Sequence, residues 1–206
     1  FGPLPERLLG RLDAARSLRV RSTSGTDLSV DLGDPALYPR SFIGRAPRAA
    51  GEIGAPLCRS VTAPFVHGAA RGVVVFDGVG RIQGPHPTVL TGDAGVVLTI
   101  VDGMLTDVTG ASAAADALRE WIDAAPTNDV RTVMDCNIGC DPRLDPAWGD
   151  NSTIHSVLGG FMVGIGNPYE WRPDGSHRPG HHLDLLLPGV DVDLDDEPLL
   201  RGGTFV

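Results

Sequence analysis

The fold is decided by the stretch Val96-Val97-Leu98-Thr99-Ile100-Val101-Asp102-Gly103-Met104-Leu105-Thr106-Asp107-Val108. Two runs rich in apolar and β-branched residues flank Asp102-Gly103, a dipeptide typical of the two-residue turn of a β-hairpin. Because the two arms of a hairpin run in opposite directions, the sequence predicts a sheet that is at least partly antiparallel.

Upstream of this hairpin, the sequence predicts one helix and several strands. Residues 4–18 have apolar positions at helical spacing. Residues 18–32 alternate instead and are broken by Ser24-Gly25, which predicts two short strands joined by a turn. A further strand is expected at 72–77, and the Pro-, Gly- and Arg-rich residues 35–64 predict mostly loop.

Downstream of the hairpin, a helix is predicted at 112–125, where Pro126 ends it. Apolar runs at 130–134, 161–165 and 183–187 each adjoin a polar or glycine-rich cluster, so they are expected to be strands that carry side chains to a common rim. Strands outnumber helices, and both parallel and antiparallel signals occur. The predicted fold class is therefore α+β (mixed α/β), with a twisted mixed sheet and few helices, and residues 1–206 are expected to form a single metal-binding domain.

Composition excludes several classes of function. The net charge of −9 argues against a nucleic-acid partner, and the absence of Lys among the 17 basic residues excludes a Schiff-base mechanism. Apolar runs fall far short of the roughly 20 residues of a membrane-spanning helix. Three cysteines are too few for a disulfide framework, so the cytoplasm is the expected location. The chain begins at Phe1 without an initiator Met, and we expect a fragment or a processed chain.

The strongest chemical signal is His182-Leu183-Asp184 at the start of an apolar run. Residues two apart on a strand share a face, so His182 and Asp184 can point at one metal ion while Leu183 enters the core. An imidazole nitrogen and a carboxylate oxygen are suitable ligands for such an ion. The alternative is a surface histidine beside an aspartate at the edge of a strand.

A second candidate ligand is Asp135, which directly follows an apolar run. A strand that ends in a carboxylate can present it to a site, although a turn with local hydrogen bonds is the alternative. Cys136 and Cys140 lie nearby, but four-residue spacing without a second Cys pair is a weak zinc signal, and buried inert thiols explain them better.

Three more residues are candidates. Glu52 is a lone acid in a Gly/Pro-rich loop, where most acids are simply solvated. His155 lies in a polar stretch and is interpreted as a ligand, a hydrogen-bond donor to a ligand or an ordinary loop residue. Tyr169 follows a glycine-rich turn, from which it can donate a hydrogen bond to an oxyanion or cap the core.

The order of motifs resembles the aminopeptidase T (thermophilic aminopeptidase) family of metallopeptidases from about residue 4 to the end. Each motif is weak by itself, but eight in order are fairly specific. The matching segments are Gly25-Thr26-Asp27-Leu28, Gly51-Glu52-Ile53 with Ala55-Pro56, Val74-Val75-Phe76-Asp77-Gly78, Asp102-Gly103, Asp135 ahead of Gly139-Cys140-Asp141-Pro142, Met162 to Gly166 with Tyr169, His182-Leu183-Asp184, and Gly203-Thr204-Phe205-Val206.

The resemblance implies the C-terminal part of a homodimeric metallo-aminopeptidase, without that family's N-terminal domain. It implies a co-catalytic pair of Zn²⁺, Co²⁺ or Mn²⁺ ions, for which Glu52, Asp135, His182 and Asp184 are the candidate ligands, with Tyr169 assisting at the scissile carbonyl. Asp135 stands where the family has Glu. Thr62-Ala63-Pro64 also matches the strand entry and would put Arg59 at the first Glu position.

A larger departure is Met162, which occupies the first position of the His-x-x-x-Gly segment. A thioether is a poor ligand for these ions, so one metal position is expected to be weak or empty. The related dihydroxypyridine ring-cleaving dioxygenases resemble this chain in the His-x-Asp strand and lack the same His. That resemblance implies one Fe²⁺ on two His and one carboxylate, for which His182, Asp184 and His155 are candidates, although the dioxygenases would place a His where Asp135 stands.

Three hypotheses of function follow. The first is a metal-dependent hydrolase of aminopeptidase type that acts on small peptides or amino-acid amides, with metal-activated water and an oxyanion stabilised by Tyr169. The second is a mononuclear Fe²⁺ dioxygenase that opens a hydroxylated aromatic or N-heterocyclic ring. The third is a binding or assembly module that retains the scaffold but no catalytic activity.

Overall fold

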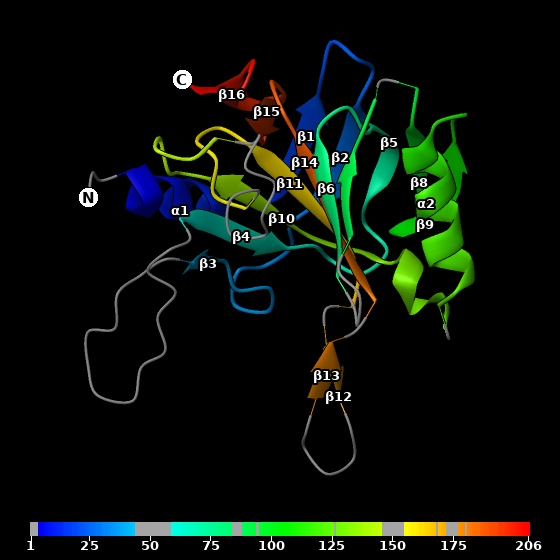
Figure 1. Cartoon of the computed structure of the whole chain (residues 1–206). Coiled ribbons are helices and arrows are strands. Elements are labelled where there is room, and N and C mark those ends of the chain that lie inside the picture. The colour runs from blue at the N-terminus through cyan, green and yellow to red at the C-terminus, as the bar shows by residue number, and fades with distance from the viewer. Residues whose placement is uncertain are drawn as a thin grey trace.

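The computed structural model describes residues 4–43, 59–83, 88–93, 95–125, 127–145, 155–167, 169–171, 177–179 and 181–206. For residues 42–43, 169–171 and 177–179 it describes the backbone alone. Two β-sheets dominate the described part of the chain (Figure 1).

The first sheet has eight strands. They are β1 (Ser17–Arg21), β2 (Asp27–Asp31), β5 (Arg71–Val75), β8 (Val97–Val101), β9 (Met104–Thr109), β15 (Asp191–Leu194), β16 (Glu197–Arg201) and β17 (Thr204–Phe205). Their order across the sheet is β17-β16-β15-β1-β2-β5-β8-β9, so the C-terminal strands pair with the N-terminal ones.

The second sheet has seven strands. They are β3 (Ser41–Ile43), β4 (Ser60–Pro64), β6 (Val79–Gln83), β7 (Thr88–Thr91), β10 (Val133–Gly139), β11 (Phe161–Gly166) and β14 (His182–Leu187). Their order is β3-β4-β10-β11-β14-β6-β7, which makes β10, β11 and β14 central. A separate hairpin of β12 (Tyr169–Trp171) and β13 (His177–Pro179) lies below the sheets in Figure 1.

The predicted α+β class with a mixed sheet is wrong, because the described part of the chain is mainly antiparallel β. Of these residues, 47% lie in strands and 16% in helices. Every pairing between the named strands is antiparallel. Parallel neighbours would need long, usually helical, crossovers, whereas only two α-helices are present among the described residues, α1 (Leu4–Ala14) and α2 (Ala113–Asp123).

The helices and strands predicted from the sequence agree with the structure better than the predicted fold class does. The predicted hairpin is β8–β9, where Asp102 and Gly103 adopt φ of 48° and 73°, as both central residues of a type I′ turn require. α1 ends four residues before the predicted helix end, because the alternation of β1 begins at Ser17. α2 begins after Ser112, whose side chain accepts a hydrogen bond from Ala115 N. The predicted strand at 130–134 is instead a short 3₁₀ helix (Asn128–Arg131) followed by β10.

One hydrophobic core joins residues of both sheets. In the central strands of the second sheet, alternate residues enter this core: Cys136, Ile138, Phe161, Val163, Ile165, Leu183, Leu185 and Leu187. The residues between them lie on the opposite face of that sheet, because side chains alternate along a strand. Among the described residues, no helix has the length and apolarity needed to cross a membrane.

Candidate metal centre

Three predicted ligands share the sheet face that points away from the core. Gly164 on β11 lies in register between Asp135 on β10 and Asp184 on β14, and His182 lies two residues before Asp184. A Cβ added to Gly164 would lie 1.9 Å from Asp135 Oδ1 and 3.2 Å from His182 Cε1. The Asp135 carboxylate and the His182 ring therefore both extend over Gly164, and the structure brings Asp135, His182 and Asp184 together.

The orientation of the buried His182 ring is set by a backbone carbonyl. Its Nδ1 donates to Gly166 O at 2.7 Å, and its Nε2 lies 3.0 Å from Asp184 Oδ1. A neutral ring that donates from Nδ1 would present an Nε2 lone pair to a carboxylate, so this contact requires either a second proton or a cation. Burial opposes protonation, but the hydrogen bond and charge of Asp184 outweigh it, and the pKa of His182 is raised.

Asp184 is fully buried and accepts several hydrogen bonds. Its Oδ1 faces His182, and its Oδ2 lies 2.5 Å from Gln83 Nε2 and 3.2 Å from His155 Nε2. Burial raises the pKa of this carboxyl group, but the hydrogen bonds from His155 and His182 outweigh burial and lower it. Asp184 is therefore an anion at neutral pH, as a metal ligand must be.

Asp135 has an unsatisfied oxygen. Its Oδ1 is buried and has no hydrogen-bond partner within the described part of the chain. Burial raises the pKa of Asp135, the charge of His182 opposes this, and the charge of Asp184 adds to it. A buried acceptor without a partner is costly, and a cation shared with His182 and Asp184 would satisfy it.

His155 reaches the cluster from a turn that is anchored to the end of β10. Ser156 O accepts from Asp141 N at 2.8 Å, and Ser156 Oγ accepts from Arg59 N at 2.8 Å. The turn also passes so close to Gly139 that a Cβ there would lie 1.9 Å from the carbonyl oxygen of Val157. This anchoring places His155, with 19% of its side chain exposed, against Asp184.

The donor atoms pair with one another rather than surround a common point. Among the described residues, no group of three or more His, Cys, Asp or Glu side chains is arranged to hold an ion as it stands. If two ligand atoms each lie about 2.1 Å from one ion and form an angle of about 90° at it, they are about 3.0 Å apart. His182 Nε2 and Asp184 Oδ1 are separated by 3.0 Å. The nitrogen and oxygen donors and the unsatisfied Asp135 Oδ1 therefore fit a divalent first-row ion.

The remaining predicted residues lie elsewhere or are only partly described. Glu52 lies outside the described residues, and for Tyr169 only the backbone, paired with Pro179, is described, so their predicted roles stay predictions. Cys136 and Cys140 are free and buried. Burial raises the pKa of both thiols, that of Cys140 to about 12, so little thiolate is present at neutral pH, in agreement with the interpretation of both as buried thiols.

Sequence reasoning missed three residues of this site, Gln83, Gly164 and Gly166. Gln83 ends a strand that the sequence pattern did not predict. A glycine inside an apolar strand pattern often marks a place where other atoms approach the backbone closely, so the pattern around Gly164 could have indicated its position beside the site. Met162 is buried on the same face of the sheet, where it lies in register with Asn137 and Leu186. Gly164, which lies between Asp135 and Asp184, follows it two residues later on the same strand.

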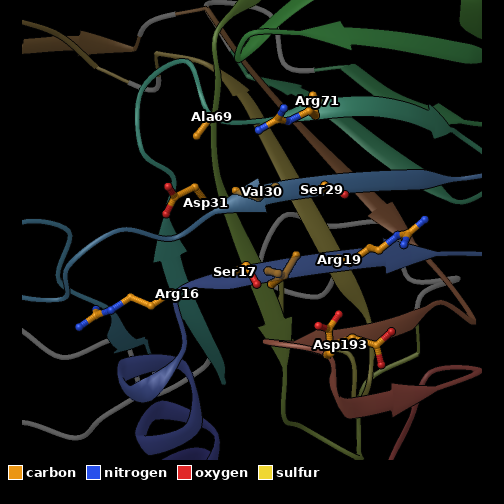
Figure 2. A pocket seen from close by; sticks show the side chains of 11 residues that line it. Arg16, Ser17, Arg19, Ser29, Val30, Asp31, Ala69, Arg71 and Asp193 are labelled. Atoms are coloured by element: carbon orange, nitrogen blue, oxygen red, sulfur yellow. The ribbon is translucent and has the colours of Figure 1, made fainter.

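A depression of about 450 Å³ lies on the other sheet, away from this cluster. Figure 2 shows that Arg16, Arg19 and Arg71 line it together with Asp31 and Asp193. Arg19 is paired with Asp27 at 2.9 Å, and Asp193 is paired with arginines on both of its oxygens. The charges of this depression are largely balanced, and its described lining contains no histidine or cysteine, so it is a weaker candidate for a catalytic site.

Comparison with known proteins corrects the predicted function. The chain is similar to the 2,5-dihydroxypyridine dioxygenase of Pseudomonas putida KT2440, with a TM-score of 0.75 and 25% identity over 97% of this chain and 57% of that one. It is also similar in fold to AmpT of Thermus thermophilus, with a TM-score of 0.64 and 18% identity over 98% of this chain and 53% of that one. The chain thus spans little more than half the length of either protein, and no curated protein matches it significantly.

The aminopeptidase resemblance is therefore supported at the level of fold, whereas the predicted peptidase activity and the hydrolase class are wrong. The fold of the chain is similar to one protein from each group, so the fold by itself does not separate the two activities. The sequence model of the family described as NicX, 2,5-dihydroxypyridine 5,6-dioxygenase, matches residues 6–206. The chain belongs to the 2,5-dihydroxypyridine 5,6-dioxygenase family.

Proposed function

We propose that this chain carries the metal centre of a mononuclear Fe²⁺ dioxygenase that opens the ring of a hydroxylated aromatic compound or N-heterocycle. Membership of the dioxygenase family supports the reaction class. The observation that carries the proposal is the convergence of His182, Asp184, Asp135 and His155 on one face of the second sheet. The proposed metal is Fe²⁺, in place of the Zn²⁺, Co²⁺ or Mn²⁺ that the resemblance to the peptidases implied.

The proposed ligands are His182 through Nε2, His155 through Nε2 and Asp184 through Oδ1. Two imidazoles and one carboxylate are the usual ligand set of non-haem Fe²⁺ oxygenases, and they leave coordination positions for substrate and O₂. When bound, Fe²⁺ supplies the one-electron chemistry that lets O₂ react with an aromatic ring. Asp135 Oδ1 adds a second carboxylate oxygen beside His182.

The protein residues prepare this site in three ways. The Gly166 carbonyl keeps the Nε2 lone pair of His182 directed at the ion rather than at solvent. Burial of Asp184 and His182 excludes water and strengthens their attraction for a cation. The Asp135 carboxylate, which is buried beside His182 with one unsatisfied oxygen, can accept a hydrogen bond from a ring hydroxyl of the substrate.

The test is anaerobic loading with Fe²⁺, followed by oxygen-uptake measurements with 2,5-dihydroxypyridine. We expect uptake that requires Fe²⁺ and disappears, together with the bound iron, in His182→Ala. The control is His67→Ala, since His67 is exposed and lies outside the cluster. Background uptake by protein that contains stoichiometric iron would reject this substrate class, and a protein that binds no iron would support the non-catalytic module.

A further inference from the structure

Gln83 is the last residue of β6 and the one glutamine in the sequence. It lies in register with His182 on β14, so both side chains project from the same face of the sheet. Its Nε2 donates a hydrogen bond to Asp184 Oδ2 at 2.5 Å. An ionised carboxylate accepts hydrogen bonds but does not donate them, so this contact also fixes which end of the amide faces Asp184.

The two oxygens of Asp184 have different partners. Oδ1 lies 3.0 Å from His182 Nε2, whereas Oδ2 accepts from Gln83 and from His155, the latter at 3.2 Å. When His155 turns its Nε2 to an ion, Gln83 is the side chain among the described residues that continues to hold Oδ2.

We infer that Gln83 is a positioning residue that makes Asp184 bind the ion through Oδ1 alone. The inference rests on the proposed metal centre. Its amide holds Oδ2 and opposes rotation of the carboxylate, and a carboxylate that binds through one oxygen occupies one coordination position instead of two. The position that remains is available to the substrate.

The chemistry of an amide suits this role. Its NH₂ group makes a strong hydrogen bond to a carboxylate yet adds no charge to a cluster that already contains Asp135 and Asp184. Glutamate at residue 83 has the same shape but would place a like charge against Asp184. Leucine has a similar size but would leave Oδ2 without this donor.

The experiment compares the wild-type protein with Gln83→Leu under anaerobic conditions. Isothermal titration gives the dissociation constant for Fe²⁺, and the visible ligand-field spectrum of the Co²⁺-loaded protein reports the coordination number. We expect the Fe²⁺ dissociation constant of Gln83→Leu to rise about ten- to hundredfold. The Co²⁺ spectrum should also change, because Asp184 is then free to bind through both oxygens.

The matched control is Val89→Leu, an exposed position on the neighbouring strand β7, which should change neither measurement. Unchanged Fe²⁺ affinity and an unchanged Co²⁺ spectrum in Gln83→Leu would overturn the role of Gln83 while leaving the metal centre intact. Absence of Fe²⁺ and Co²⁺ binding in the wild type would instead overturn the metal centre itself.

Circular dichroism establishes whether Gln83→Leu folds. If it does not, Gln83→Asn decides by the same two measurements, since it keeps the amide but shortens the side chain by one methylene. Weaker Fe²⁺ binding with an altered Co²⁺ spectrum in this variant supports the inference, and wild-type behaviour contradicts it.

Discussion

Gly164 lies directly against two candidate ligands, the Asp135 carboxylate and the His182 ring. The Asp135 carboxylate and the His182 ring occupy the space where any larger residue would place its Cβ, 1.9 Å from Asp135 Oδ1. No Cβ atom tolerates such a contact, so a side chain at residue 164 must displace Asp135 from the cluster.

We therefore predict that Gly164→Ala weakens Fe²⁺ binding at least tenfold and lowers the free energy of unfolding of the metal-free protein by about 1–3 kcal/mol. Isothermal titration and urea unfolding measure the two effects. The control is Gly10→Ala on α1, where an added Cβ meets no atom within 4 Å. This change should leave metal binding unaffected and stabilise the helix by up to about 1 kcal/mol. Equal Fe²⁺ affinity in the two variants would contradict the assignment of Asp135.

Asp141 should make stability depend on pH. The hydrogen bonds from Arg143 outweigh the effect of burial and lower the pKa of this buried carboxyl group to about 2. Since its folded pKa lies below the unfolded value of about 3.9, its contribution of about 2 kcal/mol is present at neutral pH and is lost as pH falls from about 4 to about 2.

We predict that Asp141→Asn lowers the free energy of unfolding by about 2 kcal/mol at pH 7 and removes part of its pH dependence between about 4 and 2. Urea unfolding at a series of pH values measures both. Glu120→Gln is the control, because Glu120 is exposed on α2 and has no ion pair in the described part of the chain. An unchanged pH profile in Asp141→Asn would exclude this linkage.

At the scale of elements, the turn that carries His155 depends on a buried serine. Ser156 Oγ accepts from Arg59 N, and Ser156 is fully buried. We predict that Ser156→Ala removes this hydrogen bond, costs about 1–3 kcal/mol of stability and weakens Fe²⁺ binding through His155. The measurements are urea unfolding and isothermal titration.

Ser29→Ala is the matched control for this change. Ser29 lies on the outer face of β2, in the depression on the first sheet, and its replacement should alter stability by no more than about 0.5 kcal/mol. If Ser156→Ala and Ser29→Ala behave alike, the turn is not held in the way the hydrogen bonds indicate.

The sequence predicted the parts of the site that depend on local periodicity. His182 and Asp184 are two residues apart on a strand, so their common face follows from the pattern alone. The proximity of Gly164 to Asp135, and of Gln83 to Asp184, depends on the register between strands that are distant in sequence. Register is set by the assembled sheet, and one sequence gives little information about it.

The error in fold class has a similar origin. Every residue of β11 and of β14 is buried, so both strands appear in sequence as continuous apolar runs. Such runs are typical of parallel strands covered on both faces. Here they belong to central antiparallel strands whose second face carries the candidate site. The Asp102-Gly103 turn indicated the antiparallel topology correctly.

At the scale of the whole molecule, both sheets contribute to one hydrophobic core. We predict that the two sheets unfold together, as a single domain would, and that Phe161→Ala destabilises both by about 3–5 kcal/mol. Phe161 is fully buried on the core face of β11. Hydrogen exchange of amides in β1 and β14 would report on the two sheets separately. Different losses of protection would indicate two units. Val101→Ala, at a largely exposed position, is the control.

The homodimer and the cytoplasmic location stay predictions.

The alternation along β14 also limits how this protein can evolve. His182 and Asp184 face the site, and Leu183 and Leu185 face the core. Insertion or deletion of a single residue within this strand would exchange the two sets, placing an imidazole and a carboxylate in the hydrocarbon core and leucines in the candidate site. Length changes of one residue should therefore be eliminated by selection here, whereas changes of two preserve the faces. Related chains should differ in this segment by substitution or by even-numbered steps.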